Sequence, residues 1–426
     1  MKPLRILMSS QVYADGNGQG GFALRLAESL AKEGHQVKVL TPSDHTTSYS
    51  VIVNCVQVEK VAAIHMSIVH PAVYVTPWPL PRVKKIFREF MPDIVHIQDH
   101  YFLCMAVTRE ARKRHIPLVG TNHFLPENLL PFLIRSPLLR NLTARVLWKI
   151  MLSVFNQMDS VTTPSHAAAN ILRNQDIRFP VQAISNGVDI KRFAFDPKVD
   201  RQGTRRKYGL ATDKTLFFYV GRLDGEKRVD IMVQAVSELP QTNFQLVIAG
   251  NGSQARVLRH QAHRLGVEER VIFLGYVPAT DLPALYMSTD IFVMPSSAEL
   301  QSIATLEAMS CGKPVLAANA RALPELVEHG VNGYLFESDN ASDAAHWMNK
   351  FLESPEQWAE MGKVGIMRSQ SHSLNNTIQA YEEYYQMVIE NRLEVQEPSM
   401  VNDIKTPEAY RSKKMSNRKP ESTRGE

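Results

Sequence analysis

The sequence predicts an α/β protein of two domains, each built on a parallel sheet. The chain has 426 residues, which suits two domains of about 200 residues that can each bury a core. Short β-branched runs alternate with helical patterns, which is typical of parallel sheets covered by helices. Two such series occur, and residues 185–205 between them gather turn-forming pairs and charges.

Apolar runs along the sequence predict the strands and helices of each domain in order. In the first domain, strands are expected at Leu4–Met8, Gln36–Leu40, 93–97 and 117–121, with helices over 27–35 and through Arg112. The segment ISNGVDIKRF then precedes a second series. Its strands are expected at 215–221, 244–250, 271–277, 290–295, 313–317 and 332–336, with helices near Ile231–Leu239 and Ala255–Leu265.

These elements set the expected domain limits. We place the first domain at residues 1–190 and the second at residues 191–370. A helix over 371–393 is expected to pack back on the first domain. Residues 394–426 have few large apolar side chains and mixed charge, so we expect a disordered tail.

Composition narrows the class of protein. Hydrophobic residues make up 44% and charged residues 21%, as in ordinary soluble globular proteins. The net charge of +5 suits an anionic ligand or membrane surface and does not imply nucleic acid. Cys55, Cys104 and Cys311 are too far apart to indicate a disulfide framework or a metal site, so we expect a reducing, cytoplasmic location. No apolar run is long enough to span a membrane.

Three glycines near the amino terminus have the spacing of a dinucleotide fingerprint. Gly16, Gly18 and Gly21 fit it, but the fingerprint needs a glycine directly after the first strand and an acidic residue ending the second. The first strand ends well before Gly16, and residues 41–43 are Thr-Pro-Ser, which disfavours a nicotinamide cofactor. A flexible glycine loop before a helix remains. It either approaches an anion or sugar, or only connects two elements.

The stretch DIFVMPSSAELQSIATLEAMSCGKPVLA is the most informative about chemistry. It predicts a strand, a polar loop, a helix and a second strand. Glu299 precedes the helix, Ser302 is suited to cap it, and Glu307 lies more than a turn inside. Two carboxylates and free backbone N–H groups would then face one crevice. The alternative is that both glutamates are solvated surface charges.

The segment GRLDGEKRVD suggests an anion site. A strand end delivers Arg222 and a short loop delivers Lys227 to the same place, where two cations can neutralise a diphosphate. The alternative is a pair of surface charges on a loop. The chain contains no Asp-x-Asp sequence, a carboxylate pair suited to holding a metal ion beside a diphosphate.

Several motifs in order resemble the retaining glycosyltransferases of family 4, which have the GT-B fold of two Rossmann-like domains facing a cleft. The resemblance covers roughly residues 2–390. It depends on the Glu-x7-Glu pair and GRLDGEKRVD, together with GG at Gly20 and Gly21, TNH ending at His123, NGVD from Asn186 and AGNG from Ala249. It implies a metal-independent hexosyltransferase that needs no cofactor and takes a nucleoside diphosphate sugar as co-substrate.

The resemblance also assigns roles. Glu299 would hydrogen-bond the transferred sugar, Glu307 the nucleotide ribose, and Arg222 and Lys227 the leaving diphosphate. His123 would line the sugar pocket, although a lone histidine after a strand is also common as a structural residue. The remaining donor-binding residues would be Gly20, Gly21, Gly250, Val277, Gln301, Ser302 and Ile303, with Asp15 on the acceptor side. The family commonly has Phe-Gly after the first glutamate, whereas this chain has Leu-Gln-Ser, so the donor sugar is left unspecified.

The acceptor is suggested by a basic, leucine-rich stretch. No acidic residue occurs between Glu127 and Asp159, a segment that carries the cations Arg135, Arg140, Arg145 and Lys149 among leucines, Phe132, Ile134, Trp148 and Phe155. An apolar face bordered by cations is typical of a helix lying in an anionic membrane surface. The alternative is a core helix with a basic outer face.

The sequence thus favours transfer of a hexose to a lipid hydroxyl at the inner face of the cell membrane, as in the bacterial diacylglycerol glucosyltransferases and phosphatidylinositol mannosyltransferases that the chain resembles. A soluble sugar, polyol or polysaccharide acceptor is the alternative within the same class. An NAD-dependent oxidoreductase and a non-catalytic nucleotide-sugar-binding protein are the alternatives from other classes.

Overall fold

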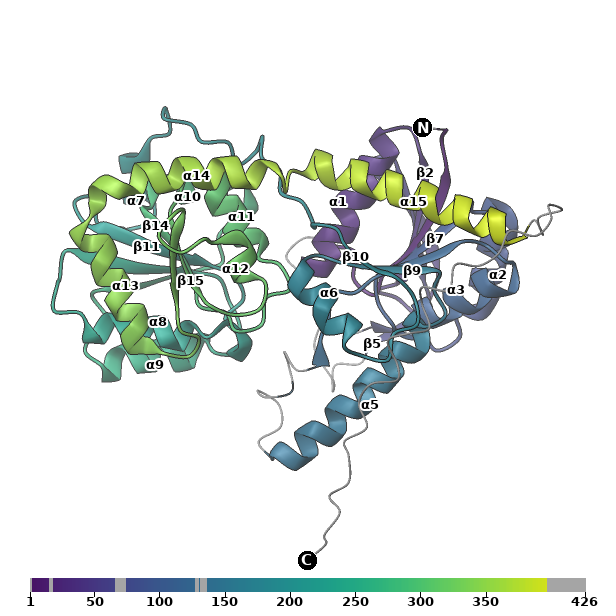
Figure 1. Ribbon diagram of the computed structural model, residues 1–426, viewed down its shortest axis with the longest axis horizontal. Coiled ribbons are helices and arrows are strands. Elements are labelled where there is room, and N and C mark those ends of the chain that lie inside the picture. Colours follow the sequence, from purple (N-terminus) through teal and green to yellow (C-terminus); the bar gives the residue numbers. More distant parts are fainter. Residues whose placement is uncertain (1, 15–17, 66–73, 127–129, 131–135, 397–426) are drawn as a thin grey trace, which may run out of the picture.

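The computed structural model describes residues 2–14, 18–65, 74–126, 130 and 136–396. These residues form two lobes, each with its own sheet, and one long helical stretch runs along both lobes (Figure 1). The amino-terminal lobe is built from the first half of the chain together with the last helix.

The amino-terminal sheet has eight strands in the order β10-β9-β8-β7-β1-β2-β4-β3. Every neighbouring pair is parallel except the antiparallel hairpin β3–β4. The strands are β1 (Arg5–Ser9), β2 (Gln36–Pro42), β3 (Tyr49–Val53), β4 (Val56–Val61), β7 (Ile94–Ile97), β8 (Leu118–Thr121), β9 (Ser160–Thr163) and β10 (Val181–Ala183), with a separate two-stranded sheet of β5 (Ile64–His65) and β6 (Tyr74–Val75).

Helices cover both faces of this sheet. Side chains alternate along a strand, so Ile6 and Met8 of β1 enter one hydrophobic cluster while Leu7 between them enters another. The helices of this part of the chain are α1 (Gly18–Lys32), α2 (Leu80–Phe90), α3 (Phe102–Lys113), α5 (Pro137–Phe155) and α6 (His166–Arg173). Such two-sided burial explains why the central strands are continuous apolar runs.

The carboxyl-terminal sheet has six strands, all parallel, in the order β13-β12-β11-β14-β15-β16. Its strands are β11 (Thr215–Val220), β12 (Phe244–Ala249), β13 (Val271–Gly275), β14 (Ile291–Met294), β15 (Val315–Ala318) and β16 (Gly333–Phe336). The helices are α7 (Arg201–Lys207), η1 (Gly225–Lys227), α8 (Val229–Glu238), α9 (Ala255–Arg264), η2 (Ala279–Asp281), α10 (Leu282–Ser288), α11 (Ile303–Ser310), α12 (Leu323–Leu326), α13 (Ala341–Glu353), η3 (Pro355–Gln357) and α14 (Trp358–Gln370).

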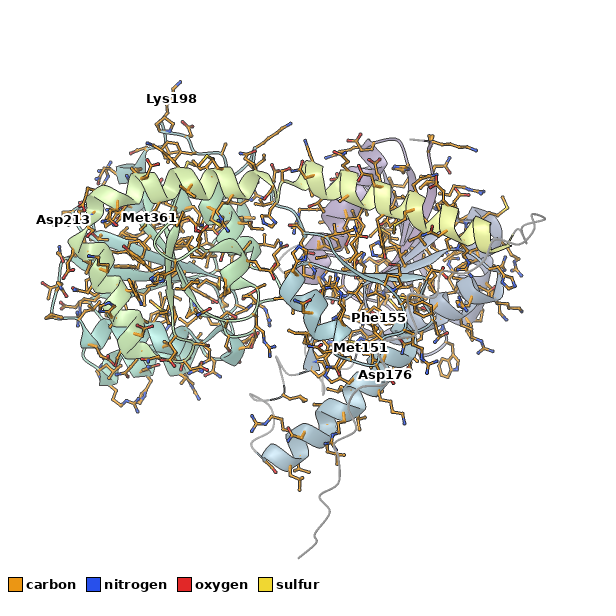
Figure 2. All side chains as sticks on the ribbon, in the orientation of Figure 1. Met151, Phe155, Asp176, Lys198, Asp213 and Met361 are labelled. Carbon is orange, nitrogen blue, oxygen red and sulfur yellow. The ribbon has the colours of Figure 1, made fainter. Side chains whose placement is uncertain are left out.

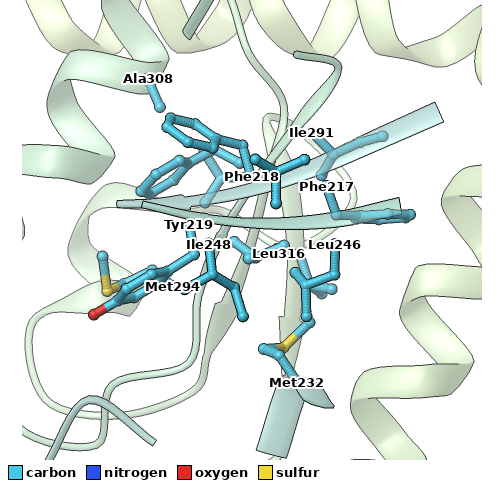
Figure 3. Close-up of a cluster of buried hydrophobic side chains, with 14 of the residues drawn as sticks. Phe217, Phe218, Tyr219, Met232, Leu246, Ile248, Ile291, Met294, Ala308 and Leu316 are labelled. Atoms are coloured by element: carbon cyan, nitrogen blue, oxygen red, sulfur yellow. The ribbon is translucent and has the colours of Figure 1, made fainter. Parts of the chain in front are cut away.

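The core of this lobe lies on both faces of β11. Phe217 and Phe218 are adjacent in sequence and fully buried, and Figure 3 shows their rings amid side chains from β12, β14 and α11. The strand order reverses beside β11, because β12 lies on one side of it and β14 on the other. In open parallel sheets, ligands bind at the carboxyl ends of strands beside such a reversal.

The last helix, α15 (Leu374–Gln396), returns the chain to the amino-terminal lobe (Figure 1). Its start is joined to the first crossing between lobes, since Ser373 pairs with Val188 in a parallel bridge. Tyr381, Tyr384 and Tyr385 are then buried in the same cluster as β1. The amino-terminal core is therefore completed by residues from the far end of the chain.

Several expectations differ from the structure. The glycine-rich segment was expected to be a loop, but α1 begins at Gly18 and places Gly20 and Gly21, both buried, inside its first turn. The helix expected at 371–393 extends to Gln396. Residues 397–426 of the expected tail lie outside the described part of the chain. Strands β3, β4, β9 and β10 and helix α2 were not expected.

Candidate active site

The loop between β14 and α11 carries the first group of candidate residues. Ser302 caps α11 as expected, because its hydroxyl oxygen accepts a hydrogen bond from Thr305 N at 3.2 Å. Ile303 is the first residue of the helix. Glu299 is nearly buried just before the cap. The local sequence therefore holds a carboxylate beside the amino end of a helix.

A second loop meets this one after β11. Lys227 ends η1 and its Nζ donates to Oε1 of Glu299 at 2.7 Å. The loops are also joined through the backbone, because Ser297 N and the Ser296 hydroxyl both donate to the carbonyl oxygen of Glu226. The hydrogen bonds between the two loops, as well as the ion pair itself, thus hold Lys227 close to Glu299.

Arg222 lies at the entrance to the same loop. Its guanidinium donates to Asp224 Oδ2 at 2.5 Å and to Glu226 Oε1 at 2.8 Å, and its side chain is 58% exposed. The sequence predicted that Arg222 and Lys227 come to one place, but it did not predict that carboxylates pair with both. An anionic ligand here would compete with these carboxylates for the two cations.

Glu307 lies inside α11 and faces a buried phenol. The hydroxyl of Tyr286 on α10 donates to Oε2 of Glu307 at 2.9 Å. Burial raises the pKa of Tyr286 well above its usual range, with the nearby Glu307 charge adding to the effect. The phenol therefore keeps its proton and fixes one oxygen of Glu307. Tyr286 was not predicted, and nothing in its sequence setting distinguishes it from a core tyrosine.

Two of the candidate glycines lie where neighbouring atoms leave no room for a Cβ. Gly250 follows β12 with φ +134°, and a Cβ there would lie 1.9 Å from the carbonyl oxygen of Gly221. Gly20 is tightly packed in α1, where a Cβ would lie 2.7 Å from Val12 Cγ1. Both glycines lie beyond the carboxyl end of a sheet strand. Gly250 lets the backbone turn beyond β12, and Gly20 lets α1 pack closely against residues 12–14, which follow β1.

Val277, expected to bind the donor, follows β13. Its side chain is buried in the core of the carboxyl-terminal lobe. Tyr276 beside it is 75% exposed. Only the backbone of Val277 is left for a nucleobase, and Tyr276 is the better side-chain candidate.

The amino-terminal lobe contributes His123, which follows β8. Its Nε2 lies 2.9 Å from Oε1 of Gln98, and its ring packs against Phe22 of α1 at 5.0 Å between centroids. Burial lowers the pKa of His123 to about 3, so the imidazole is neutral at pH 7. Gln98 was not predicted, although its position directly after the expected strand at 93–97 is a signal that could have found it.

Contacts between the lobes bring the two groups together. Leu300, next to Glu299, enters the hydrophobic cluster of the amino-terminal lobe that also contains Leu125, two residues beyond His123. On the same side of the molecule, Glu325 of α12 accepts hydrogen bonds from His166 N and Ala167 N at the start of α6. A carboxylate from one lobe thus caps a helix of the other.

Gln301 connects the donor-side loop to the crossing between the lobes. Its Oε1 accepts from Asn186 N at 2.7 Å, its Nε2 donates to the Ser185 hydroxyl at 2.9 Å, and His372 Nδ1 lies 3.5 Å from the same nitrogen. The side chains of Gln301 and Ser302 are therefore committed to protein contacts. The sequence left open whether their backbone or side-chain groups would meet a sugar, and the structure favours the backbone.

Helix α5 carries the basic segment. Trp148 and Phe155 are buried in the lobe, as the alternative of a core helix required, and Figure 2 shows Phe155 and Met151 among its packed side chains. The amino-terminal half of α5 extends away from the lobe (Figure 1). An exposed stripe follows this half, made of side chains 44–79% exposed: Leu138, Leu139, Leu142, Val146 and Ile150. We call this set the α5 stripe.

Cations accompany the α5 stripe. Arg145 and Lys149 are exposed and Arg140 is half-buried. Arg135 and Asp15, two further residues singled out from the sequence, lie outside the described residues. Among the described helices, none is both long and apolar enough to cross a bilayer.

A cavity of about 430 Å³ lies on the opposite edge of the carboxyl-terminal sheet, beside the start of β11. Its lining includes Arg201, Arg205 and Asp290, which are already joined in ion pairs. None of the candidate residues described above lines it.

Together, the two parallel sheets and the loops that meet between them define the GT-B class of proteins, in which two Rossmann-like domains share a site. The model of the family described as Glycosyltransferase Family 4 matches residues 16–192, and that of Glycosyl transferases group 1 matches residues 200–367. Glycosyltransferase models therefore match both lobes, the family 4 model the first lobe and the group 1 model the second, so the chain resembles the family 4 glycosyltransferases over most of its length.

Relatives and solved structures agree with this assignment. The chain is 26% identical over 362 residues to GDP-mannose-dependent alpha-mannosyltransferase of Corynebacterium glutamicum, covering 82% of this chain and 81% of the relative. It is 24% identical over 261 residues to alpha-monoglucosyldiacylglycerol synthase of Streptococcus pneumoniae, covering 60% and 58%. The structure of Anabaena HepE in complex with UDP and glucose superposes with a TM-score of 0.73 at 22% identity, covering 90% and 99%.

Proposed function

We propose that this glycosyltransferase transfers a hexose from a nucleoside diphosphate sugar to a hydroxyl group of a membrane lipid, with retention of configuration and without a metal ion. The observation that carries the donor half of the proposal is the Lys227–Glu299 pair, with Arg222 beside it, at the carboxyl edge of the second sheet. Names of relatives add support, since one uses GDP-mannose and another makes a glucosyldiacylglycerol.

The cations account for the leaving group. As the bond between the anomeric carbon and the diphosphate oxygen breaks, negative charge grows on that oxygen. Lys227 and Arg222 stabilise this charge. Each fixed donor of this kind lowers the free energy of the transition state by about 3 kcal/mol. The backbone N–H groups at the start of α11 act in the same direction.

Glu299 is the residue we assign to the sugar. With no donor present, Lys227 holds one of its oxygens. A diphosphate would share Lys227, and the carboxylate of Glu299 would then accept hydrogen bonds from sugar hydroxyls while keeping part of its cation. Glu307, whose carboxylate is oriented by Tyr286, is the residue we assign to a ribose hydroxyl.

Retention follows if the acceptor attacks from the side that the diphosphate leaves. The acceptor oxygen forms the new bond to the anomeric carbon, the old carbon–oxygen bond breaks, and the departing phosphate oxygen takes the hydroxyl proton. No protein nucleophile is needed. His123, neutral at pH 7, lines the sugar side of the site and does not have to exchange a proton.

The acceptor half of the proposal depends on the α5 stripe and its cations. Five exposed apolar side chains beside Arg140, Arg145 and Lys149 match the pattern of a helix that inserts its apolar face into an anionic lipid surface. Each cation contributes about 1 kcal/mol near such a surface. We infer peripheral binding, with the hydroxyl of the lipid presented to the site.

The test is release of nucleoside diphosphate from UDP- and GDP-sugars, with and without vesicles of anionic lipid that contain diacylglycerol or phosphatidylinositol. The proposal predicts release that depends on the vesicles and a glycolipid whose anomeric configuration matches the donor by NMR. It also predicts full activity after treatment with a chelator. Turnover on soluble sugars alone would favour the soluble-acceptor alternative, and inverted product or chelator-sensitive turnover would contradict the mechanism.

A further inference from the structure

A buried chain of hydrogen bonds runs from His123 to α15. The Nε2 of His123 lies 2.9 Å from Oε1 of Gln98. The Nε2 of Gln98 in turn lies 3.2 Å from Nε2 of His96, and Nδ1 of His96 lies 2.7 Å from the hydroxyl of Tyr385 on α15. This series of hydrogen bonds therefore connects the site to α15, the helix that completes the amino-terminal core.

The side-chain amide of Gln98 determines which atom donates and which accepts in its hydrogen bond with His123. Its Oε1 can only accept and its Nε2 can only donate. His123 must then carry its proton on Nε2, and the lone pair is left on Nδ1. The amide nitrogen of Gln98 lies 3.2 Å from Nε2 and 3.4 Å from Nδ1 of His96, so it packs against that ring and does not by itself select the His96 tautomer. The amide of Gln98 thus orders the proton of His123.

Gln98 is itself held firmly. It is buried at the carboxyl end of β7, where parallel pairing with β1 and β8 fixes the backbone. His96, which it contacts, is fully buried and further contacts the Thr121 hydroxyl at 2.7 Å. Phe22 closes the other side of His123. The imidazole thus has an amide at one nitrogen and an aromatic ring against it.

We infer that Gln98 is a positioning residue for His123, whose side-chain amide fixes both the orientation of the imidazole and the nitrogen that carries its proton. This inference rests on the role proposed for His123 at the sugar. A site loses catalysis steeply when a group moves, and a displacement of about 1 Å can cost on the order of a hundredfold in rate. Gln98 acts through His123 and does not itself touch the sugar.

The first test is the proton position. In protein labelled with ¹⁵N-histidine, the His123 signals are assigned by their loss in H123A and recorded at pH 7. Wild type is expected to show a protonated Nε2 and an unprotonated Nδ1. In Q98M, which keeps the length of the side chain and removes both polar atoms, the two shifts are expected to move toward each other as the tautomers mix. An unchanged pattern in Q98M would overturn the inference.

The second test is kinetic and uses a matched control. Gln245 is a buried glutamine on β12 that accepts from Ala211 N, far from His123 in the other lobe. Q245M removes the same atoms as Q98M and costs stability alone. We expect Q98M to lower kcat about tenfold or more with little change in donor KM, and Q245M to leave both unchanged. Equal kcat in Q98M and Q245M would contradict the inference.

H123A separates this inference from the proposed function. If H123A keeps full turnover, the role of His123 in the proposed function is wrong, while the NMR result still decides whether Gln98 orders its proton. If H123A loses turnover and Q98M does not, His123 acts at the sugar and Gln98 does not position it.

Discussion

The Nζ of Lys227 and the Oε1 of Glu299 lie 2.7 Å apart and join two loops of the carboxyl-terminal lobe. Only 19% of the Lys227 side chain and 10% of the Glu299 side chain are exposed. Because both charges are largely withdrawn from water, removing one leaves the other poorly compensated. Without ligand, the pair therefore stabilises the contact between the two loops. In the proposed function, Lys227 binds the diphosphate when the donor is present.

Lys227→Ala and Arg222→Ala are each expected to lower turnover about 100-fold or more, because charge on the leaving oxygen loses a fixed partner. Nucleoside diphosphate release under saturating donor measures this. Lys363→Ala is the matched control, since Lys363 forms an exposed pair with Glu360 on α14. Nearly normal turnover in both active-site variants would remove the assigned role.

Glu307→Ala is expected to raise the donor KM more than it lowers kcat, because a ribose contact exists before and during the reaction. Tyr286→Phe should have a smaller effect in the same direction, since it frees the carboxylate oxygen without removing it. Initial rates at varied donor concentration separate the two constants. A donor KM unchanged in Glu307→Ala would argue against ribose binding.

Arg140→Glu with Arg145→Glu should abolish sedimentation with anionic vesicles and reduce transfer to lipid, while hydrolysis of the donor by water stays unchanged. The control is Arg256→Glu with Arg264→Glu, which makes the same change of net charge on α9 of the other lobe. Wild-type protein that ignores anionic vesicles at low salt would contradict docking by α5.

The α5 stripe gives an independent version of this test. Leu142→Ser with Val146→Ser keeps every cation and removes apolar contact, so binding to anionic vesicles should weaken while thermal stability is retained, because both side chains are exposed. Loss of thermal stability would show instead that the stripe is covered by protein.

Gln301→Ala should lower thermal stability and raise the donor KM together. The substitution leaves the buried Asn186 N–H without its acceptor, a loss of about 1–3 kcal/mol, and it frees the loop that carries Glu299 from the crossing between lobes. Thermal melts and donor titrations measure the two effects. A lowered melting temperature with an unchanged KM would show that the contact does not influence donor binding.

Acid should destabilise the protein through its buried imidazoles. Burial lowers the pKa of His96 and His123 to about 3, against about 6.5 in the unfolded chain. The unfolded state then binds more protons between these values, so stability is complete above about pH 6.5 and falls as the pH is lowered. At pH 5 the loss is about 2 kcal/mol for each group.

Urea denaturation at pH 7.5 and pH 5 tests whether the free energy of unfolding falls at the lower pH. His96→Gln should reduce the difference between the two midpoints, and His260→Gln, at an exposed position, should leave it as in wild type. The same difference in all three proteins would contradict the assignment to buried imidazoles.

The parallel sheets could be predicted because their strands are short, apolar and separated by helical patterns. Strands β3 and β4 were missed, because they form an antiparallel hairpin that departs from the alternation of strands and helices. The edge strand β3 reads Tyr-Ser-Val-Ile-Val, a β-branched run that could have been assigned from the sequence although its side chains are almost wholly exposed. Strand β9 reads Ser-Val-Thr-Thr, and one of its buried hydroxyls, that of Thr162, lies 3.0 Å from the Tyr381 hydroxyl of the distant α15. No local pattern carries that information.

Part of the candidate site could also be predicted. The sequence placed Arg222 and Lys227 on one loop and Glu299 just before a helix, and the capping role of Ser302 followed from its position. The contact between Lys227 and Glu299 was added by the structure. The partners of these groups could not be predicted, because they depend on tertiary contacts. Tyr286 reaches Glu307 from another helix, and Gln301 turns away from the expected ligand toward a crossing more than a hundred residues earlier in the sequence.

The return of α15 to the first lobe has a consequence for biosynthesis. The cluster that holds Ile6 and Phe22 is closed by Tyr381 and Tyr385, which a ribosome adds only after the whole second lobe has been made. The second lobe, from β11 to α14, is contiguous and can fold first as a complete unit. Until α15 emerges, the cluster on this face of the first sheet is covered by α1 but lacks the α15 side chains, so the second lobe can complete its core before the first lobe does.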